Sequence, residues 1–304
     1  MALINVNDSF DSSVFNGASC AFGVFDGLHE GHRYLIEQAC ATAAQGQRSL
    51  VLTFDIDPDE VFHPERLRKL MSNDRRLNAL MRTGVDDVVV LPFIPEWYSM
   101  DPLDVLEKLC GENAPAYLHV GEDFRFGARA AGTVQTLDDW GIAAGCNIRA
   151  HHLLSSDGKP ITATRIRLLL ADGHVKDAAA LLGRPYRMIG TVVKGRGEGP
   201  ALGFATANMN VPDRDRVVGD GVYAAYARVC GQTCKAAVSV GVAPTFENAT
   251  ANIEAHLLDF DGDIVGKELG LEFVKFMRPM MKFDSADELV ATVKGNIDWV
   301  RQNL

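Results

Sequence analysis

Residues 20–32 of the chain read CAFGVFDGLHEGH, and this stretch decides the fold of the first half. Its apolar start predicts a buried strand over residues 20–25, Asp26-Gly27 marks a turn, and a helix is expected to begin near Gly31. Similar apolar runs, separated by segments with apolar residues three and four apart, lie at residues 50–54, 88–93, 117–121 and 148–153. Apolar strands that alternate with helices predict a doubly wound α/β domain with a parallel sheet. Its ligand should bind beyond the carboxyl ends of the strands.

The second half has a different pattern of predicted helices and strands. Two helices are predicted over residues 164–170 and 175–182, and Gly183-Arg-Pro then breaks the helical pattern. Six strands follow with no helix between them, at residues 189–193, 204–211, 222–230, 236–242, 253–260 and 271–277. This pattern predicts a six-stranded antiparallel β-barrel, followed by a C-terminal helix with a capping box of Ser285 and Glu288. We therefore place a domain boundary near residue 184, which divides the chain into residues 1–183 and 184–304.

The composition excludes several classes of protein. The 304 residues are 47% hydrophobic and 23% charged, and 30 Lys and Arg against 40 Asp and Glu give a net charge of −10. This acidic balance disfavours nucleic acid as a partner, and no run approaches the ~20 apolar residues of a membrane span. The start MALINVNDSF does not resemble a secretion signal, and the six cysteines lack paired zinc-ligand spacing. We expect a cytoplasmic protein with reduced thiols and small-molecule partners; a weak homo-oligomer stays open.

Two histidines follow the first predicted strand. His29 and His32 are three residues apart, so they can point the same way across the turn that opens the helix. The helix N-terminus offers free backbone N–H groups and a partial positive charge. Two imidazoles at such a place suit binding of a polyphosphate and stabilisation of an attacked phosphoryl centre. Two surface histidines beside a loop are the alternative interpretation, and the position directly after a strand favours the functional one.

The second half holds a glycine-rich stretch, KGRGEG at residues 194–199. A proline and a strand follow it rather than a helix, so it is not a dinucleotide fingerprint, and a flexible hairpin is the alternative. Thr206 and Asn208 share one face of the next strand, where a hydroxyl and an amide oxygen could hold Mg²⁺ or simply lie on the outer face of a barrel. Glu254 opens a later strand, where a lone glutamate is usually solvated.

The motif FGVFDGLHEGH at residues 22–32 resembles the signature of the nucleotidylyltransferase superfamily, in its flavin branch. The chain is similar, nearly end to end, to the bacterial bifunctional riboflavin kinase/FMN adenylyltransferase (FAD synthetase) family. The further motifs that carry the resemblance follow in order: LTFDIDP at 52–58, VVVLPF at 88–93, VGEDFRFG at 120–127, ITATRIRLLLADG at 161–173, LLGRPY at 181–186, GTVVKGRGEGPALGFATAN at 190–208, GVYAAYA at 221–227, SVGVAPTF at 239–246, IEAHLLDF at 253–260 and MRPMMKF at 277–283.

The resemblance implies both a fold and a function. A Rossmann-like nucleotidylyltransferase domain would precede a riboflavin kinase barrel. The barrel would phosphorylate riboflavin to FMN, and the first domain would adenylylate FMN to FAD with release of pyrophosphate. ATP would be the co-substrate of both reactions and Mg²⁺ the cofactor. The alternatives are a riboflavin kinase with an impaired N-terminal domain and a non-catalytic regulatory paralogue that binds flavin or nucleotide.

The resemblance also implies roles for individual residues. In the first domain it makes His29 and His32 catalytic, and it assigns ATP or flavin binding to Gly23, Phe25, Asp26, Gly31, Asp123, Phe124, Thr164 and Arg167. In the barrel it makes Glu254 the base for the riboflavin hydroxyl and gives the metal to Thr206 and Asn208. ATP or flavin binding there is assigned to Gly195, Gly197, Gly203, Thr206, Asn208 and Arg278.

Two residues depart from the family pattern near the nucleotide. Asp57 stands where the family usually has a histidine, and Ala163 stands where it has a phosphate-binding serine. A carboxylate close to phosphates would repel them, and a missing hydroxyl would remove one hydrogen bond. We therefore expect adenylyl transfer to be slow.

Overall fold

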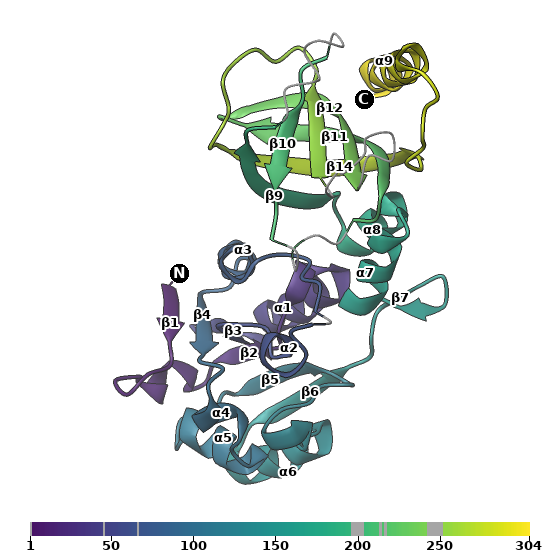
Figure 1. Cartoon of the computed structure of the whole chain (residues 1–304). Helices are drawn as coiled ribbons and strands as arrows, with labels where there is room; N and C mark the ends of the chain where they lie inside the picture. The colour runs from purple at the N-terminus through teal and green to yellow at the C-terminus, as the bar shows by residue number, and fades with distance from the viewer. Residues whose placement is uncertain are drawn as a thin grey trace. The chain divides into compact units, whose positions relative to one another are not determined.

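The computed structural model describes residues 2–44, 46–65, 67–195, 204–212, 215, 218–241 and 252–304 (Figure 1). By their contacts the residues form two units. The first comprises Met1–Leu67 and Met71–Thr162, and the second comprises Arg68–Leu70 and Ala163–Leu304. The predicted parallel α/β architecture of the first half and the antiparallel barrel of the second are both confirmed. Among the described residues, no helix is long and apolar enough to cross a membrane.

A six-stranded sheet with the order β1-β4-β3-β2-β5-β6 forms the centre of the first unit, and all its neighbouring strands are parallel. The order reverses between β2 and β5, and open α/β sheets bind their ligands beyond the strand ends at such a switch point. The strands are β1 (Ala2–Asn5), β2 (Ser19–Phe22), β3 (Ser49–Phe54), β4 (Asp87–Leu91), β5 (Tyr117–Gly121) and β6 (Asn147–His151). The sequence did not predict β1, a short edge strand whose residues are mostly exposed.

Helices cover both faces of this sheet (Figure 1). Ala21, Val51, Val88 and Val90 pack with α1 and α3 on one face, whereas their strand neighbours, such as Cys20 and Leu50, pack with α5 and α6 on the other. Burial on both faces explains the continuous apolar runs. The helices are α1 (Glu30–Thr42), α2 (Asp59–Phe62), α3 (Asn73–Leu80), α4 (Pro95–Tyr98), α5 (Pro102–Cys110) and α6 (Val134–Ala144), with short 3-10 turns η1 (Ser12–Phe15), η2 (Asp26–Leu28) and η3 (Ala128–Ala130) and the small hairpin β7 (Ser155–Ser156) and β8 (Lys159–Pro160).

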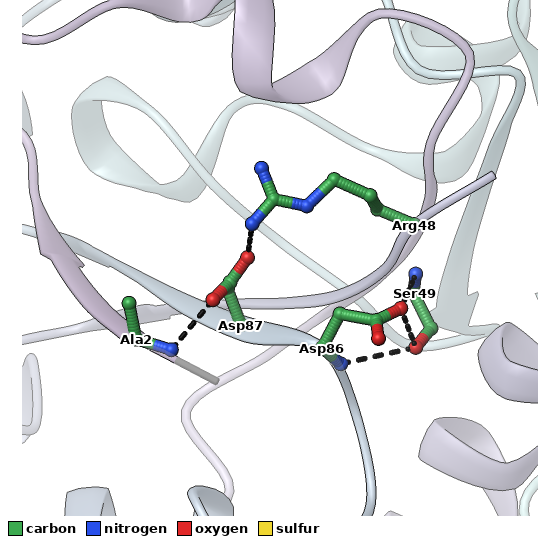
Figure 2. Close-up of polar contacts among 5 residues, drawn as sticks. All are labelled: Ala2, Arg48, Ser49, Asp86 and Asp87. Carbon is green, nitrogen blue, oxygen red and sulfur yellow. Dashed lines mark hydrogen bonds and ion pairs between the residues drawn. The ribbon is translucent and has the colours of Figure 1, made fainter. Parts of the chain in front are cut away.

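Charged and polar side chains fix the amino ends of β1, β3 and β4 (Figure 2). Asp87 at the start of β4 accepts a hydrogen bond from the backbone N–H of Ala2 and forms an ion pair with Arg48. The Asp86 carboxylate accepts bonds from both the backbone N–H and the hydroxyl of Ser49, at 2.8 and 2.9 Å. These bonds fix the alignment of β1, β3 and β4 without involving the candidate site.

A chain of hydrogen bonds through two histidines links α1, β5 and β6. His119 on β5 is 1% exposed, its Nε2 lies 2.7 Å from the Thr42 hydroxyl, and its Nδ1 lies 2.9 Å from Nε2 of His151. The Thr42 hydroxyl donates to the Gln38 carbonyl, so we assign the proton of His119 to Nε2 and leave Nδ1 as the acceptor from His151. With the proton on Nδ1 instead, the unprotonated Nε2 and the Thr42 oxygen would face each other as two acceptors.

This chain makes the stability of the first unit depend on pH. Burial, with smaller contributions from His151 and Arg149, lowers the pKa of His119 from 6.5 to about 4. Above pH 6.5 the imidazole is neutral in both states; below it the unfolded chain takes up a proton that the folded one refuses, so stability falls until pH 4. One such group costs about 2 kcal/mol at pH 5. Urea unfolding measures the free energy of unfolding at pH 7.5 and at pH 5.0. The loss of stability between these two pH values should be about 2 kcal/mol smaller in His119→Gln than in the native protein. An equal loss in both proteins would contradict this role of His119.

The second unit contains a closed antiparallel barrel with the strand order β10-β13-β12-β11-β14-β9. The strands are β9 (Tyr186–Val193), β10 (Ala207–Asn210), β11 (Gly221–Val229), β12 (Gln232–Gly241), β13 (Asn252–Leu257) and β14 (Glu268–Arg278). The final helix α9 (Ala286–Asn303) packs Val300 against Ala224 and Leu258. Ser285 caps α9 as predicted, but the reciprocal bond of Glu288 goes to the N–H of Asp284.

Two helices precede the barrel and belong to the same unit: α7 (Ala163–Ala171) and α8 (Val175–Leu182). Val175, Ala178, Leu181 and Leu182 of α8 are buried, and α8 contacts β9 and β14. This packing ties the residues just before position 184 to the barrel.

The predicted boundary near residue 184 is tested by comparing two fragments, 163–304 and 184–304. We expect both to fold and the shorter one to be less stable by several kcal/mol, because it exposes the strand surface that α8 covers. Thermal unfolding followed by circular dichroism measures the difference. Equal melting temperatures would show that α8 contributes nothing to the barrel.

Candidate functional site

The turn after β2 is held in a conformation that its sequence does not favour. Phe25 has a φ of 62°, in the left-handed region that bulky residues rarely adopt, and its ring is completely buried. Gly23 leaves room for that ring, since a Cβ atom there would lie 3.2 Å from it. The predicted strand over 20–25 therefore ends at Phe22, and the buried ring fixes the path of the chain toward the two histidines.

His29 caps helix α1, which begins at Glu30 rather than Gly31. Its Nδ1 accepts a hydrogen bond from the backbone N–H of His32 at 3.3 Å, so the neutral ring carries its proton on Nε2. The rings of His29 and His32 stack with their centroids 3.6 Å apart. A side chain at Gly31 would press on the His29 ring, at 3.2 Å. The structure thus brings the two predicted catalytic histidines together at a helix N-terminus.

The environment of His32 keeps its imidazole neutral. Burial, then the charges of His29 and Arg76, lower the pKa of His32 well below its usual value. Its Nδ1 is buried and has no hydrogen-bond partner among the residues that the structure describes. Phe25 packs edge-on against the ring at 5.3 Å. A neutral imidazole with an unused nitrogen can bind an added group.

Asp26, Asp123 and Phe124 lie in the loops after β2 and β5. Asp26 is buried and accepts a hydrogen bond from the backbone N–H of Met71 at 3.3 Å. Asp123 and Phe124 follow β5, and the ring of Phe124 lies 4.7 Å from that of Phe22 at the end of β2. A Cβ atom at Gly121 would lie 2.9 Å from the Asp123 carboxylate. Phe124 therefore packs against the end of β2, beside the point where the strand order reverses.

Arg76 on α3 is a site residue that the sequence analysis missed. It is 1% exposed, and its guanidinium donates to the carbonyls of Val24, Phe54 and Asp55 and to the Thr53 hydroxyl. Burial lowers the pKa of Arg76, and nearby carboxylates, that of Asp57 foremost, oppose the shift. In the sequence NDRRLNAL an arginine looks like part of a solvated helix face, so no local signal could have identified it.

Asp57 does not stand as an uncompensated negative charge. It is 7% exposed, accepts a hydrogen bond from the backbone N–H of Asp59 at 3.0 Å, and lies within electrostatic reach of Arg76. The predicted repulsion of phosphates assumed a bare carboxylate. The adjacent guanidinium weakens that argument for slow adenylyl transfer.

An aromatic cluster is a second feature that was missed. Phe54 at the end of β3 packs against Phe93, which contacts both Phe62 and Tyr98, with ring centroids 5.2 to 5.6 Å apart. Phe62 is 50% exposed. Phe54 also packs against the buried ring of Phe22 at 5.7 Å, so the aromatic surface formed by Phe62, Phe93 and Tyr98 at α2 and α4 is anchored to the end of β3. Such a surface can stack with a planar ring system.

Thr164 and Arg167 lie on α7, which the contacts assign to the second unit, whereas His29 and His32 lie in the first. The same holds for Ala163. Their part in binding ATP phosphates stays a prediction.

The barrel carries a row of polar side chains on its outer face. Asn208 on β10 pairs with Glu254 on β13, which pairs in turn with Ser239 on β12. Neighbours of Glu254 on the strand, Ile253 and Ala255, are buried, so this row points away from the barrel interior. The structure therefore places the predicted base directly opposite a predicted metal ligand.

The segment before β10 is fixed to this row. The carbonyl of Ala205 accepts a hydrogen bond from Nδ1 of His256 at 2.8 Å, and Thr206 follows directly. A Cβ atom at Gly195 would collide with the side-chain amide of Asn208, which explains a glycine there. Arg278 ends β14 and donates to the carbonyl of Pro279 at 3.1 Å; burial lowers its pKa. Gly197 and Gly203 lie outside the described residues.

The donor set of this row fits Mg²⁺. Thr206 offers a hydroxyl and Asn208 an amide oxygen, and hard oxygen ligands of this kind suit Mg²⁺. Among the described residues, no group of three or more His, Cys, Asp or Glu is placed to hold a metal ion. Mg²⁺ that shares its shell with substrate phosphates needs no such group.

Comparisons with known proteins match both halves. A family model described as FAD synthetase matches residues 11–165, and one described as riboflavin kinase matches residues 182–304. The bifunctional riboflavin kinase/FMN adenylyltransferase of Pseudomonas fluorescens is 30% identical over 92% of this chain and 91% of its own. The protein of the same description from Escherichia coli K12 is 31% identical over 96% of this chain and 95% of its own.

The fold is shared over the whole chain with a solved structure. A crystal structure described as a macrolide-efflux protein from Streptococcus pneumoniae has a TM-score of 0.83 and 27% identity, and the match covers 99% of both chains. Because both halves match their family models and the curated relatives span nearly the full length, an impaired or non-catalytic paralogue is not favoured. The chain belongs to the bifunctional riboflavin kinase/FMN adenylyltransferase family.

Proposed function

We propose that the two reactions of this bifunctional enzyme occur at the two sites described above, adenylyl transfer at the histidine motif and riboflavin phosphorylation at the outer polar row of the barrel. The observation that carries the first assignment is the stacked pair His29 and His32 at the switch point of the parallel sheet. The observation that carries the second is the register of Asn208 and Glu254.

At the first site the phosphate of FMN attacks the α-phosphate of ATP, and pyrophosphate leaves. The Nε2–H of His29 and the N-terminus of α1 stabilise negative charge that develops on the phosphates. Asp26, Gly23, Phe25 and Gly31 shape the turn that positions these groups. Asp123 and Phe124 contact the nucleotide from the loop after β5, and the resemblance assigns phosphate contacts to Thr164 and Arg167 as well.

At the second site Glu254 takes the proton of the riboflavin 5′-hydroxyl as its oxygen attacks the γ-phosphate of ATP. Thr206 and Asn208 would hold Mg²⁺, which neutralises phosphate charge when it is bound. Gly195 lets the backbone lie close to the nucleotide, and Arg278 contributes positive charge for ATP or flavin; the resemblance assigns nucleotide binding to Gly197 and Gly203 as well. His256 positions the segment that bears Thr206 through its bond to the Ala205 carbonyl.

One assay separates these assignments. The purified protein is incubated with riboflavin, ATP and Mg²⁺, and FMN and FAD are resolved by chromatography; a second incubation starts from FMN. We expect both products in the first and FAD in the second. FMN without FAD would contradict the role of the first unit, and neither product would contradict both roles.

The aromatic surface around Phe62 is where we place the flavin ring of FMN. Phe62→Ala should raise the KM for FMN about tenfold, because stacking on an aromatic ring contributes roughly 1 kcal/mol or more, and should leave riboflavin phosphorylation unchanged. Ile142→Ala is the matched control, since Ile142 is 85% exposed on α6. An unchanged KM for FMN in Phe62→Ala would place the flavin elsewhere.

A cytoplasmic location agrees with this function, which uses intracellular ATP, and with six cysteines that form no disulfide. The substrates are small molecules, and no nucleic acid or membrane takes part in either reaction. A weak homo-oligomer stays open to measurement by light scattering.

A further inference from the structure

We propose that Arg76 is a positioning residue for adenylyl transfer, which holds the histidine-bearing loop after β2 to the end of β3. This inference rests on the proposed role of His29 and His32, and it concerns a residue that does not itself touch substrate.

The backbone hydrogen bonds between β2 and β3 end just before the loop that carries the histidines. The last backbone bond between β2 and β3 at this edge runs from the Gly23 N–H to the Leu52 carbonyl, at 3.1 Å. Beyond it the chain turns away toward His29, so the next carbonyl, that of Val24, has left the ladder. Nη1 of Arg76 donates to that carbonyl at 2.8 Å. The guanidinium therefore continues the connection between the strands by one residue.

The other bonds of Arg76 reach the neighbouring strand. Nη1 also donates to the Thr53 hydroxyl at 2.8 Å, and Nη2 donates to the carbonyls of Phe54 at 2.7 Å and Asp55 at 3.2 Å. Thr53 in turn donates to the Val24 carbonyl at 3.3 Å. One planar fork thus joins the loop that carries the histidines to the segment that leads to Asp57. A lysine ammonium has no such fork and cannot reproduce the pattern.

The Arg76 guanidinium is buried together with its hydrogen-bond partners and with carboxylates that offset its charge. Arg76 is 1% exposed, and a buried cation is costly unless it is paired and hydrogen-bonded. Four carboxylates, those of Asp57, Asp26, Glu60 and Asp55, act on it electrostatically. Asp26 belongs to the histidine-bearing loop after β2, and the other three carboxylates belong to the segment after β3. Opposite charge therefore draws both loops toward the same guanidinium.

The position of His29 and His32 then depends on Arg76. Only four residues separate Val24 from His29, and the turn between them includes the left-handed residue Phe25. Displacement of a catalytic group by about 1 Å costs about 100-fold in rate. The lost interaction acts on charge in the transition state, so kcat should fall while the KM for ATP changes little.

The experiment compares Arg76→Met, Arg76→Lys and Arg82→Met in the full chain. Arg82 is exposed just after α3 and serves as the matched control. We expect kcat for FAD formation from FMN to fall about 100-fold in Arg76→Met and about tenfold in Arg76→Lys, with the KM for ATP within threefold of native and no change in Arg82→Met. Riboflavin phosphorylation, measured in the same samples, should stay within twofold.

A folded Arg76→Met with native kcat for FAD formation overturns the proposal, as does a loss confined to the KM for ATP. If Arg76→Met fails to fold, Arg76→Lys and Thr53→Val decide: native kcat in both overturns the proposal, and a selective fall in kcat at native melting temperature supports it. If the native protein itself makes no FAD from FMN, the proposed function of the first unit fails instead.

Discussion

Replacing Glu254 with glutamine is expected to lower the rate of FMN formation from riboflavin at least about 100-fold, the low end for loss of a positioned general base. Glutamine keeps the size and the hydrogen-bonding reach of the side chain but cannot accept a proton. Because Glu254 lies on the outer face, in register with Asn208 and Ser239, the substitution leaves the barrel core intact. The rate is measured by chromatography of FMN at saturating riboflavin and ATP.

Two controls make this result specific. Glu268→Gln, on the exposed start of barrel strand β14, which does not pair with β13, should phosphorylate riboflavin at the native rate. Glu254→Gln supplied with FMN should still form FAD, since that reaction is assigned to the first unit. Native FMN formation in Glu254→Gln would exclude this carboxylate as the base, and loss of both reactions would point to a folding defect.

The fold was largely predictable because its strands carry strong local signals. Strands buried on both faces, such as Leu50 and Val51 in β3, give continuous apolar runs, and the barrel strands follow one another without helices. The edge strand β1 gave no such signal, because most of its residues face solvent. The left-handed φ of Phe25 also has no sequence signature, so the first strand was predicted to end three residues too late.

The candidate sites were predictable only where a motif carries them. The histidine pair follows a strand in the sequence, and the structure stacks the two rings. Arg76 could not be found in this way, since its partners lie more than twenty residues away along the chain and only the tertiary fold buries it. For the same reason Asp57 was interpreted as a repulsive charge: the sequence shows the carboxylate but not the guanidinium beside it.

The second large effect is expected at His29, which has two separable roles. As the N-cap of α1 it accepts the His32 N–H through Nδ1, and in the function proposed above its Nε2–H stabilises charge on the phosphates. Alanine removes both roles, whereas asparagine restores a good N-cap acceptor but no imidazole. His29→Ala should lose about 1 kcal/mol of stability, and both variants should form FAD about 100- to 1,000-fold more slowly, the loss typical of a missing charge-stabilising donor.

The comparison of the two variants tests this assignment. Thermal unfolding should show that His29→Asn is more stable than His29→Ala, while FAD formation from FMN stays equally low in both, and riboflavin phosphorylation should be native in each. If His29→Asn recovers FAD formation along with stability, the cap rather than the imidazole is what the reaction needs. In that case the stacked partner His32, whose Nδ1 has no partner among the described residues, becomes the group that meets the phosphates, and His32→Ala should then abolish FAD formation alone.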